Sequence, residues 1–142
     1  MRFQRADGRL IVRVEAGEEA IETLTRLCRD ERVAFASLSA AGAAKRLRLG
    51  FWNAETQAYE HHDIEDQLEV VSFQGNVAIK DGEPFLHLHG VFARSDLTTL
   101  GGHIVEAWIH PTLEVWIRVE DVPVHRSSDP ASGLDLLDLP EA

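Results

Sequence analysis

The sequence predicts an α+β domain, in which a mainly antiparallel, curved β-sheet carries one long amphipathic helix packed on it. Two observations lead to this prediction. Several segments alternate apolar and polar residues, which is the period of half-buried strands, and turn-forming residues separate them. In contrast, residues 18–32 space their apolar side chains at the period of a helix.

The first expected elements are a strand over residues 9–15 (RLIVRVE) and, after the break at Gly17, the helix over residues 18–32. Acidic residues crowd the first turns of this helix and arginines follow late, as the helix dipole favours. Its apolar stripe, which should pack on the sheet, consists of Ile21, Leu24, Leu27 and Cys28.

The remaining strands are joined by short connections. The Asp-Gly pair within residues 80–83 is the strongest hairpin signal in the chain, because Asp-Gly readily adopts the positive φ angles of a tight turn. The small residues at 40–44 indicate a close approach of two backbone segments, and we expect a turn at Pro111. The expected strands are 33–39, a third strand in which Leu47, Leu49 and Phe51 alternate, 68–79, 85–93, 103–108 and 113–119.

The length of 142 residues fits one domain, assigned to residues 1–122, followed by a C-terminal tail over residues 123–142. The tail is rich in proline, serine and aspartate, and we expect it to be loosely held. No apolar run approaches the roughly 20 residues needed to cross a bilayer. The N-terminus has no apolar core of a secretion signal and the chain has one cysteine, so we expect a cytoplasmic protein.

The charge of the chain argues against nucleic-acid binding. It contains 24 acidic and 14 basic residues, which gives a formal net charge of −10. Affinity for DNA depends mainly on Lys and Arg that neutralise phosphates. The one basic stretch contains Arg46 and Arg48, and these alternate with leucines, so we expect them on the wet face of a strand.

Two histidines in the segment EPFLHLHG raise the possibility of a metal site. Residues two apart in a strand point to the same face, so His87 and His89 lie side by side, at a Cα spacing of roughly 6.6 Å. His103 opens the next expected strand and can face this pair if the register agrees. Three imidazoles with one open position are typical of an exchangeable or catalytic zinc site. Nickel, copper and iron also suit imidazole, and the alternative is that these histidines are polar residues of a strand that binds no metal.

Glu106 follows His103 by three residues. It is a candidate acid or base, or a residue that hydrogen-bonds to a metal ligand. A regular strand, however, would direct its side chain to the face opposite His103.

The segments LEVVSFQGNVAIKDGEPFLHLHGVFA and GGHIVEAWIHPTLEVWI resemble the plants-and-prokaryotes conserved (PPC) domain, in its bacterial stand-alone form. The resemblance covers roughly residues 3–120. It implies a homotrimer in which His87, His89 and His103 match the family's metal ligands. It also implies a fold similar to that of acetolactate decarboxylase, an enzyme whose zinc is held by three histidines. Plant relatives fuse the domain to DNA-binding AT-hooks, but this sequence has no such hook.

Three functions follow from these features. The first is a metal-binding, homotrimeric module of a family labelled DNA-binding, which acts in regulation or protein interaction, with a small anion or metabolite at the metal. The second is a zinc-dependent lyase or hydrolase that acts on a small molecule. The third, direct DNA binding, is disfavoured by the charge of the chain.

Overall fold

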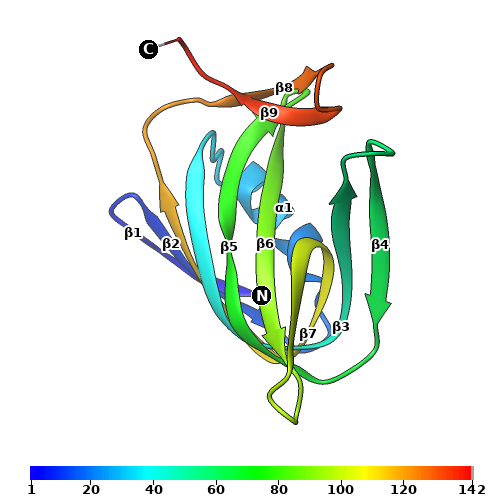
Figure 1. The fold of residues 1–142 in the computed structure, drawn as a ribbon. Helices are drawn as coiled ribbons and strands as arrows, with labels where there is room; N and C mark the ends of the chain where they lie inside the picture. The colour runs from blue at the N-terminus through cyan, green and yellow to red at the C-terminus, as the bar shows by residue number, and fades with distance from the viewer. Residues whose placement is uncertain (142) are drawn as a thin grey trace.

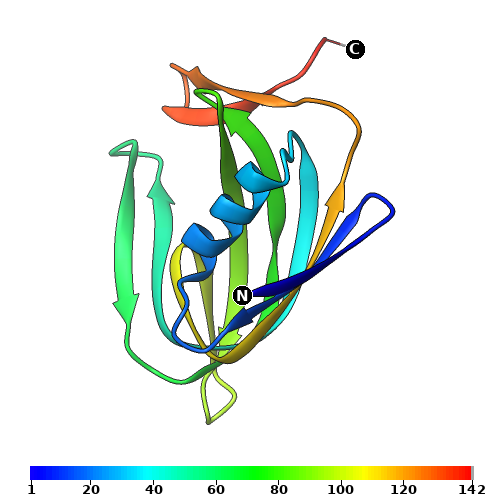
Figure 2. The same ribbon diagram turned by 180° about the vertical axis from the view of Figure 1, so that it is seen from behind.

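Residues 1–141, described in a computed structural model of the protein, form one nine-stranded sheet with a single helix lying across one face (Figures 1 and 2). Within these residues the elements are β1 (Arg2–Ala6), β2 (Arg9–Glu15), α1 (Ala20–Asp30), β3 (Ala36–Asn53), β4 (Ala58–Ile64), β5 (Leu68–Lys80), β6 (Glu83–Ala93), β7 (Thr99–Val119), β8 (His125–Asp129) and β9 (Leu134–Asp138).

The predicted α+β class with one long helix is wrong. Strands account for 66% of the chain and helix for 8%, and the sheet is mixed because β8 runs parallel to β5. Helix α1 has 11 residues rather than the 15 of the predicted segment. It begins after Glu19, whose carboxylate accepts hydrogen bonds from the amides of Ile21 and Glu22, and it ends before Arg32, which adopts a φ of 56°.

The core lies between α1 and the sheet. Leu24 and Cys28 are fully buried and Ile21 is partly buried against the same cluster, so the helix turns the predicted stripe toward the strands. The largest side chains of the sheet that bury against it are Phe73, Phe92, Leu47, Leu68, Leu88, Ile109, Leu113 and Ile117. This layer fixes which side of β6 faces inward.

The two longest strands, β3 and β7, pass through segments that the sequence marks as breaks. The close approach predicted for residues 40–44 is confirmed, because a Cβ atom at Gly42 would lie 2.8 Å from the Cα of Leu113. The turn predicted at Pro111 is wrong, since β7 continues through it. Gly42 of β3 pairs with Leu113 of β7 and Ala44 pairs with Ile109, so the register shifts between these two pairs. Pro111, which has no amide hydrogen to donate, lies within this shift and pairs with no residue of β3.

The hairpin predicted at residues 80–83 is confirmed and sets the register of the histidine strand. Lys80 pairs with Glu83, and Asp81 and Gly82 have φ angles of 51° and 82°. Strand β7 begins at Thr99, earlier than the predicted start at residue 103. Strands β6 and β7 therefore pair from Ala93 with Thr99 to His89 with His103.

The C-terminal segment forms a hairpin of β8 and β9 instead of a loose tail. Figure 1 shows this hairpin crossing the ends of β5 and β6. The amide of Ile79 donates to the carbonyl of Val124 (2.9 Å), and Val124 is buried. The boundary at residue 122 stays a prediction. The single helix of residues 1–141 lacks the length and apolar character needed to cross a membrane.

Candidate metal centre

The alternation of strand β6 separates core residues from the histidines. Leu86 and Leu88 point to the layer under α1, whereas His87 and His89 point to the opposite face. His89 pairs directly with His103 across the β6–β7 ladder. The strand period and the hairpin register therefore bring the three sequence-predicted histidines to one place.

The geometry of the cluster suits convergence on one ion. One ring nitrogen from each of His87, His89 and His103 lies within 4.8 Å of the other two. The Nε2 atoms of His87 and His89 are 3.2 Å apart, and the ring centroids are separated by 5.2–5.4 Å. Two imidazole nitrogens that each lie 2.0–2.1 Å from one ion are separated by roughly 3.3–3.5 Å in a tetrahedral site. The cluster is therefore close to the size such a site requires.

Glycines allow the strands around the cluster to pack closely. A Cβ atom at Gly75 of β5 would collide with the carbonyl of His87 and lie 3.0 Å from the Cα of Leu88. A Cβ atom at Gly101 would lie 2.6 Å from the carbonyl oxygen of Gly90 on β6. Gly101 therefore lets β7 start close beside β6.

The surroundings of His87 and His103 favour their neutral forms. Burial, and then the charges of His87 and His89, lower the pKa of His103 to about 4. Burial, followed by the charges of Arg126 and His89, also lowers the pKa of His87. The Nδ1 atom of His103 is buried and has no hydrogen-bond partner among the described residues. A neutral imidazole offers one lone pair, which is what a metal ion requires.

A cavity of about 290 Å³ opens beside the three histidines. Sequence reasoning missed four of its ten lining residues, because these four come from the C-terminal hairpin. The pattern Leu134-Asp135-Leu136 after the turn-forming segment 129–133 was the signal that could have revealed a strand there. Besides the histidines, the lining residues are Trp52, Tyr59, Phe85, Arg126, Leu134, Asp135 and Leu136.

Arg126 is the basic residue of this wall and touches the cluster directly. Its Nη2 atom lies 3.1 Å from Nδ1 of His87 and 2.8 Å from Oδ1 of Asn76. Its Nη1 atom donates to the main-chain carbonyl of Asp135 (2.6 Å). The β8–β9 hairpin therefore connects to the candidate centre through one guanidinium.

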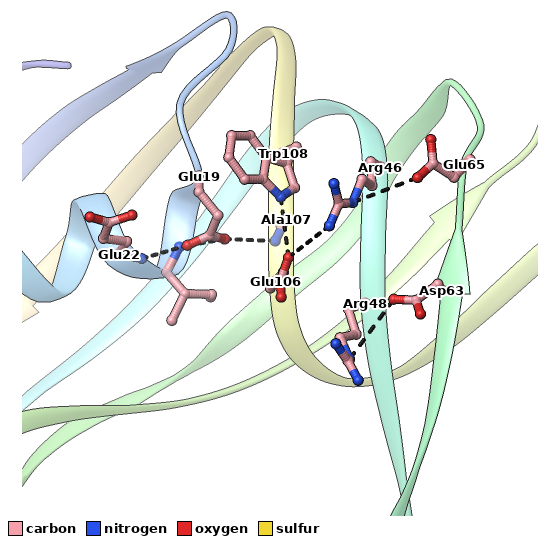
Figure 3. A network of polar contacts seen from close by, with 10 residues as sticks. Glu19, Glu22, Arg46, Arg48, Asp63, Glu65, Glu106, Ala107 and Trp108 are labelled. Atoms are coloured by element: carbon pink, nitrogen blue, oxygen red, sulfur yellow. Dashed lines mark hydrogen bonds and ion pairs between the residues drawn. The ribbon is translucent and has the colours of Figure 1, made fainter.

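Glu106 lies in a different contact network, which Figure 3 shows. Its carboxylate accepts from Nε1 of Trp108 (3.2 Å) and from Nη2 of Arg46 (3.3 Å), and it is not among the residues that line the histidine cavity. The register of β7 against β3 shifts next to Glu106, so the rule of alternating faces does not apply there.

The basic stretch of β3 is partly exposed to solvent, as predicted, and its two arginines form ion pairs with acidic side chains. The side chains of Arg46 and Arg48 are 42% and 40% exposed. Arg46 pairs with Glu106 and with Glu65 (3.8 Å), and Arg48 pairs with Asp63 (3.8 Å), as Figure 3 shows. These arginines therefore form no free basic patch.

Comparison with known proteins agrees with this architecture. The family model of the Plants and Prokaryotes Conserved (PCC) domain matches residues 1–120. A structure from Bacteroides thetaiotaomicron, to which DNA binding has been ascribed provisionally, is similar with 26% identity and a TM-score of 0.93, over 96% of each chain. A metal-containing protein from Archaeoglobus fulgidus has 26% identity and a TM-score of 0.85, over 95% of each chain.

A more distant likeness concerns the fold alone. Acetolactate decarboxylase from Bacillus subtilis has 14% identity and a TM-score of 0.59, over 87% of this chain and 57% of the enzyme. No curated protein matches the chain. The resemblance to the conserved domain and to the decarboxylase fold is thus confirmed, and the decarboxylase activity does not follow from it.

Proposed function

The chain belongs to the Plants and Prokaryotes Conserved domain family, and we propose that it is a metal-binding member in which His87, His89 and His103 coordinate one divalent ion, zinc. The observation that carries the proposal is the convergence of three imidazole nitrogens within 4.8 Å. The buried, unpartnered Nδ1 of His103 and the lowered pKa of His103 support it. The metal-containing relative from Archaeoglobus fulgidus is consistent with it.

The donor set fits zinc with one open position. Three neutral imidazoles are a common set for zinc, and the fourth position then holds water or a small anion. Asp135 is the carboxylate of the cavity wall, but it is bonded to Nζ of Lys80 (2.5 Å). When bound, such an ion polarises an oxygen ligand or lowers the pKa of a bound water.

As part of the same proposal, the protein acts as a cytoplasmic homotrimer that takes part in regulation through protein contacts. Exposed apolar side chains support an interface on the outer face of β2 and β7, where Ile11 pairs with Trp116 and both are 47% exposed. Phe92 is fully buried and cannot contribute to such an interface. Direct DNA binding is not part of the proposal, because the net charge is −10 and Arg46 and Arg48 are ion-paired.

Metal analysis tests the ion site. Protein purified without chelator should contain about one zinc per chain, as the single three-histidine site requires. The variant with His87→Ala, His89→Ala and His103→Ala should contain none. His62→Ala, which removes an exposed histidine of β4, is the matched control and should keep the metal. Metal-free wild-type protein, or a triple variant that retains the metal, would contradict the proposal.

The cavity beside the histidines supports a second candidate, a zinc-dependent lyase or hydrolase that acts on a small molecule. An activity assay with small-molecule substrates tests this candidate. Turnover should stop when the zinc is chelated, return when zinc is added back, and be absent in His103→Ala. Turnover that survives chelation would exclude this candidate.

A further inference from the structure

The guanidinium of Arg126 is partly buried without an acidic partner. It forms no ion pair within 4.0 Å with any residue that the structure describes. Its hydrogen bonds go to neutral acceptors: an amide oxygen, a main-chain carbonyl and a histidine ring. Asp135 lines the same cavity and its charge acts on Arg126 from beyond ion-pair distance, but its carboxylate accepts from Lys80 and Ser128. Charges withdrawn from water are normally paired, so this cation has room for an anion.

The contact between Arg126 and His87 is incompatible with a metal on His87. Arginine can only donate, so Nδ1 of His87 must be the accepting nitrogen of the ring. A neutral imidazole has one lone pair, and a metal ion would occupy it whichever nitrogen it bound. Metal binding at His87 therefore breaks this hydrogen bond and leaves an N–H of Arg126 without its partner at the edge of the cavity.

The cavity restricts what can accept that hydrogen bond. Its volume of about 290 Å³ admits only a small molecule, and five of its ten lining residues are Trp, Tyr, Phe or Leu. Arg126 is the one Lys or Arg side chain among the described lining residues. One oxygen of a monocarboxylate can accept from the freed N–H, and a short apolar or aromatic body matches Phe85, Leu134 and Leu136.

We propose that Arg126, released from His87 when the metal binds, holds the carboxylate of a small apolar or aromatic carboxylic acid beside the metal. This inference rests on the proposed metal site. It assigns the C-terminal hairpin the role of supplying the anion-binding residue. It also predicts that the metal and the carboxylate bind cooperatively, because each favours the state in which Arg126 is free of His87.

Calorimetric titration with benzoate tests the proposal on zinc-loaded and metal-free protein. Benzoate should bind the zinc-loaded wild type, and Arg126→Gln should weaken it at least about tenfold, as expected for loss of a charged hydrogen bond. Arg118→Gln, which removes an arginine with 69% exposure from β7, is the matched control and should bind normally. Metal-free wild type should also bind at least about tenfold more weakly. Benzamide, which has the same ring but no carboxylate, should bind poorly.

Zinc content distinguishes the possible failures. It is measured on every variant and must remain at the wild-type level in Arg126→Gln. If the wild type holds no zinc, the proposed function and this inference fail together. If the three histidines hold zinc but benzoate binds Arg126→Gln as well as wild type, or does not bind wild type, only this inference is wrong. Benzamide binding as tight as benzoate binding would also overturn it.

Discussion

Acidification of the metal-free protein should reduce its stability through His103. Burial and neighbouring charge hold the pKa of this histidine at about 4 in the folded chain, against about 6.5 for histidine in an unfolded chain. Between these two pH values the unfolded state binds more protons than the folded state. The free energy of unfolding therefore falls as the pH is lowered from about 6.5 toward about 4.

The size of this effect follows from the difference between the two pKa values. A fall from about 6.5 to about 4 corresponds to an upper bound of about 3.4 kcal/mol, at about 1.36 kcal/mol per pH unit. His103 is only partly buried, and solvent screening reduces the effect, so we expect about 1–3 kcal/mol. The lowered pKa of His87 acts in the same direction.

Urea denaturation of chelator-treated protein at pH values from about 7.5 to about 4.5 measures this free energy. His103→Gln is the control, because glutamine keeps a polar side chain that does not titrate. Its free energy of unfolding should change less with pH, by the contribution of His103. Equal pH dependence of the wild type and His103→Gln would refute the reasoning, because the acid loss would then come from other groups.

Four further predictions concern the fold, the site and the assembly. Leu24→Ala should lower the free energy of unfolding by about 2–5 kcal/mol, because Leu24 is fully buried. Leu97→Ala, at an exposed position, should change the free energy of unfolding by less than about 0.5 kcal/mol. Equal changes in the two variants would mean that this face of the helix lies in solvent. Gly75→Ala should reduce metal content, because its Cβ would displace the backbone at His87; unchanged zinc content would disprove this. Light scattering should report a trimer that Trp116→Glu weakens, and a stable wild-type monomer at micromolar concentration would remove the assembly proposal. DNA affinity at physiological salt should be no better than about 10⁻⁴–10⁻⁶ M, and nanomolar, sequence-dependent binding would contradict it.

The histidine cluster could be predicted from the sequence because its geometry depends on local rules. The strand period places His87 and His89 on one face, and the glycines before His103 indicate that β7 starts close to β6. The Asp-Gly turn fixes the register of the hairpin that carries the first two histidines. Each of these steps needs only a few neighbouring residues.

The rest of the fold depends on contacts that local patterns do not contain. Gly42 and Pro111 indicate breaks, yet β3 and β7 continue through them because a register shift between the two strands accommodates both residues. The helix was predicted too long, because the apolar stripe does not reveal that the carboxylate of Glu19 caps it. Arg126 was missed because its proline- and serine-rich surroundings are typical of a loop, while its role depends on packing against β6.

The central claim is that three histidines hold one metal ion, and anomalous diffraction from a crystal of protein purified without chelator tests it most directly. The account predicts an anomalous peak at the zinc edge, about 2.0–2.1 Å from one nitrogen of each of His87, His89 and His103, with a fourth position open to water or an anion. A well-ordered cluster without a peak, or with a water hydrogen-bonded between the rings in its place, would contradict the claim.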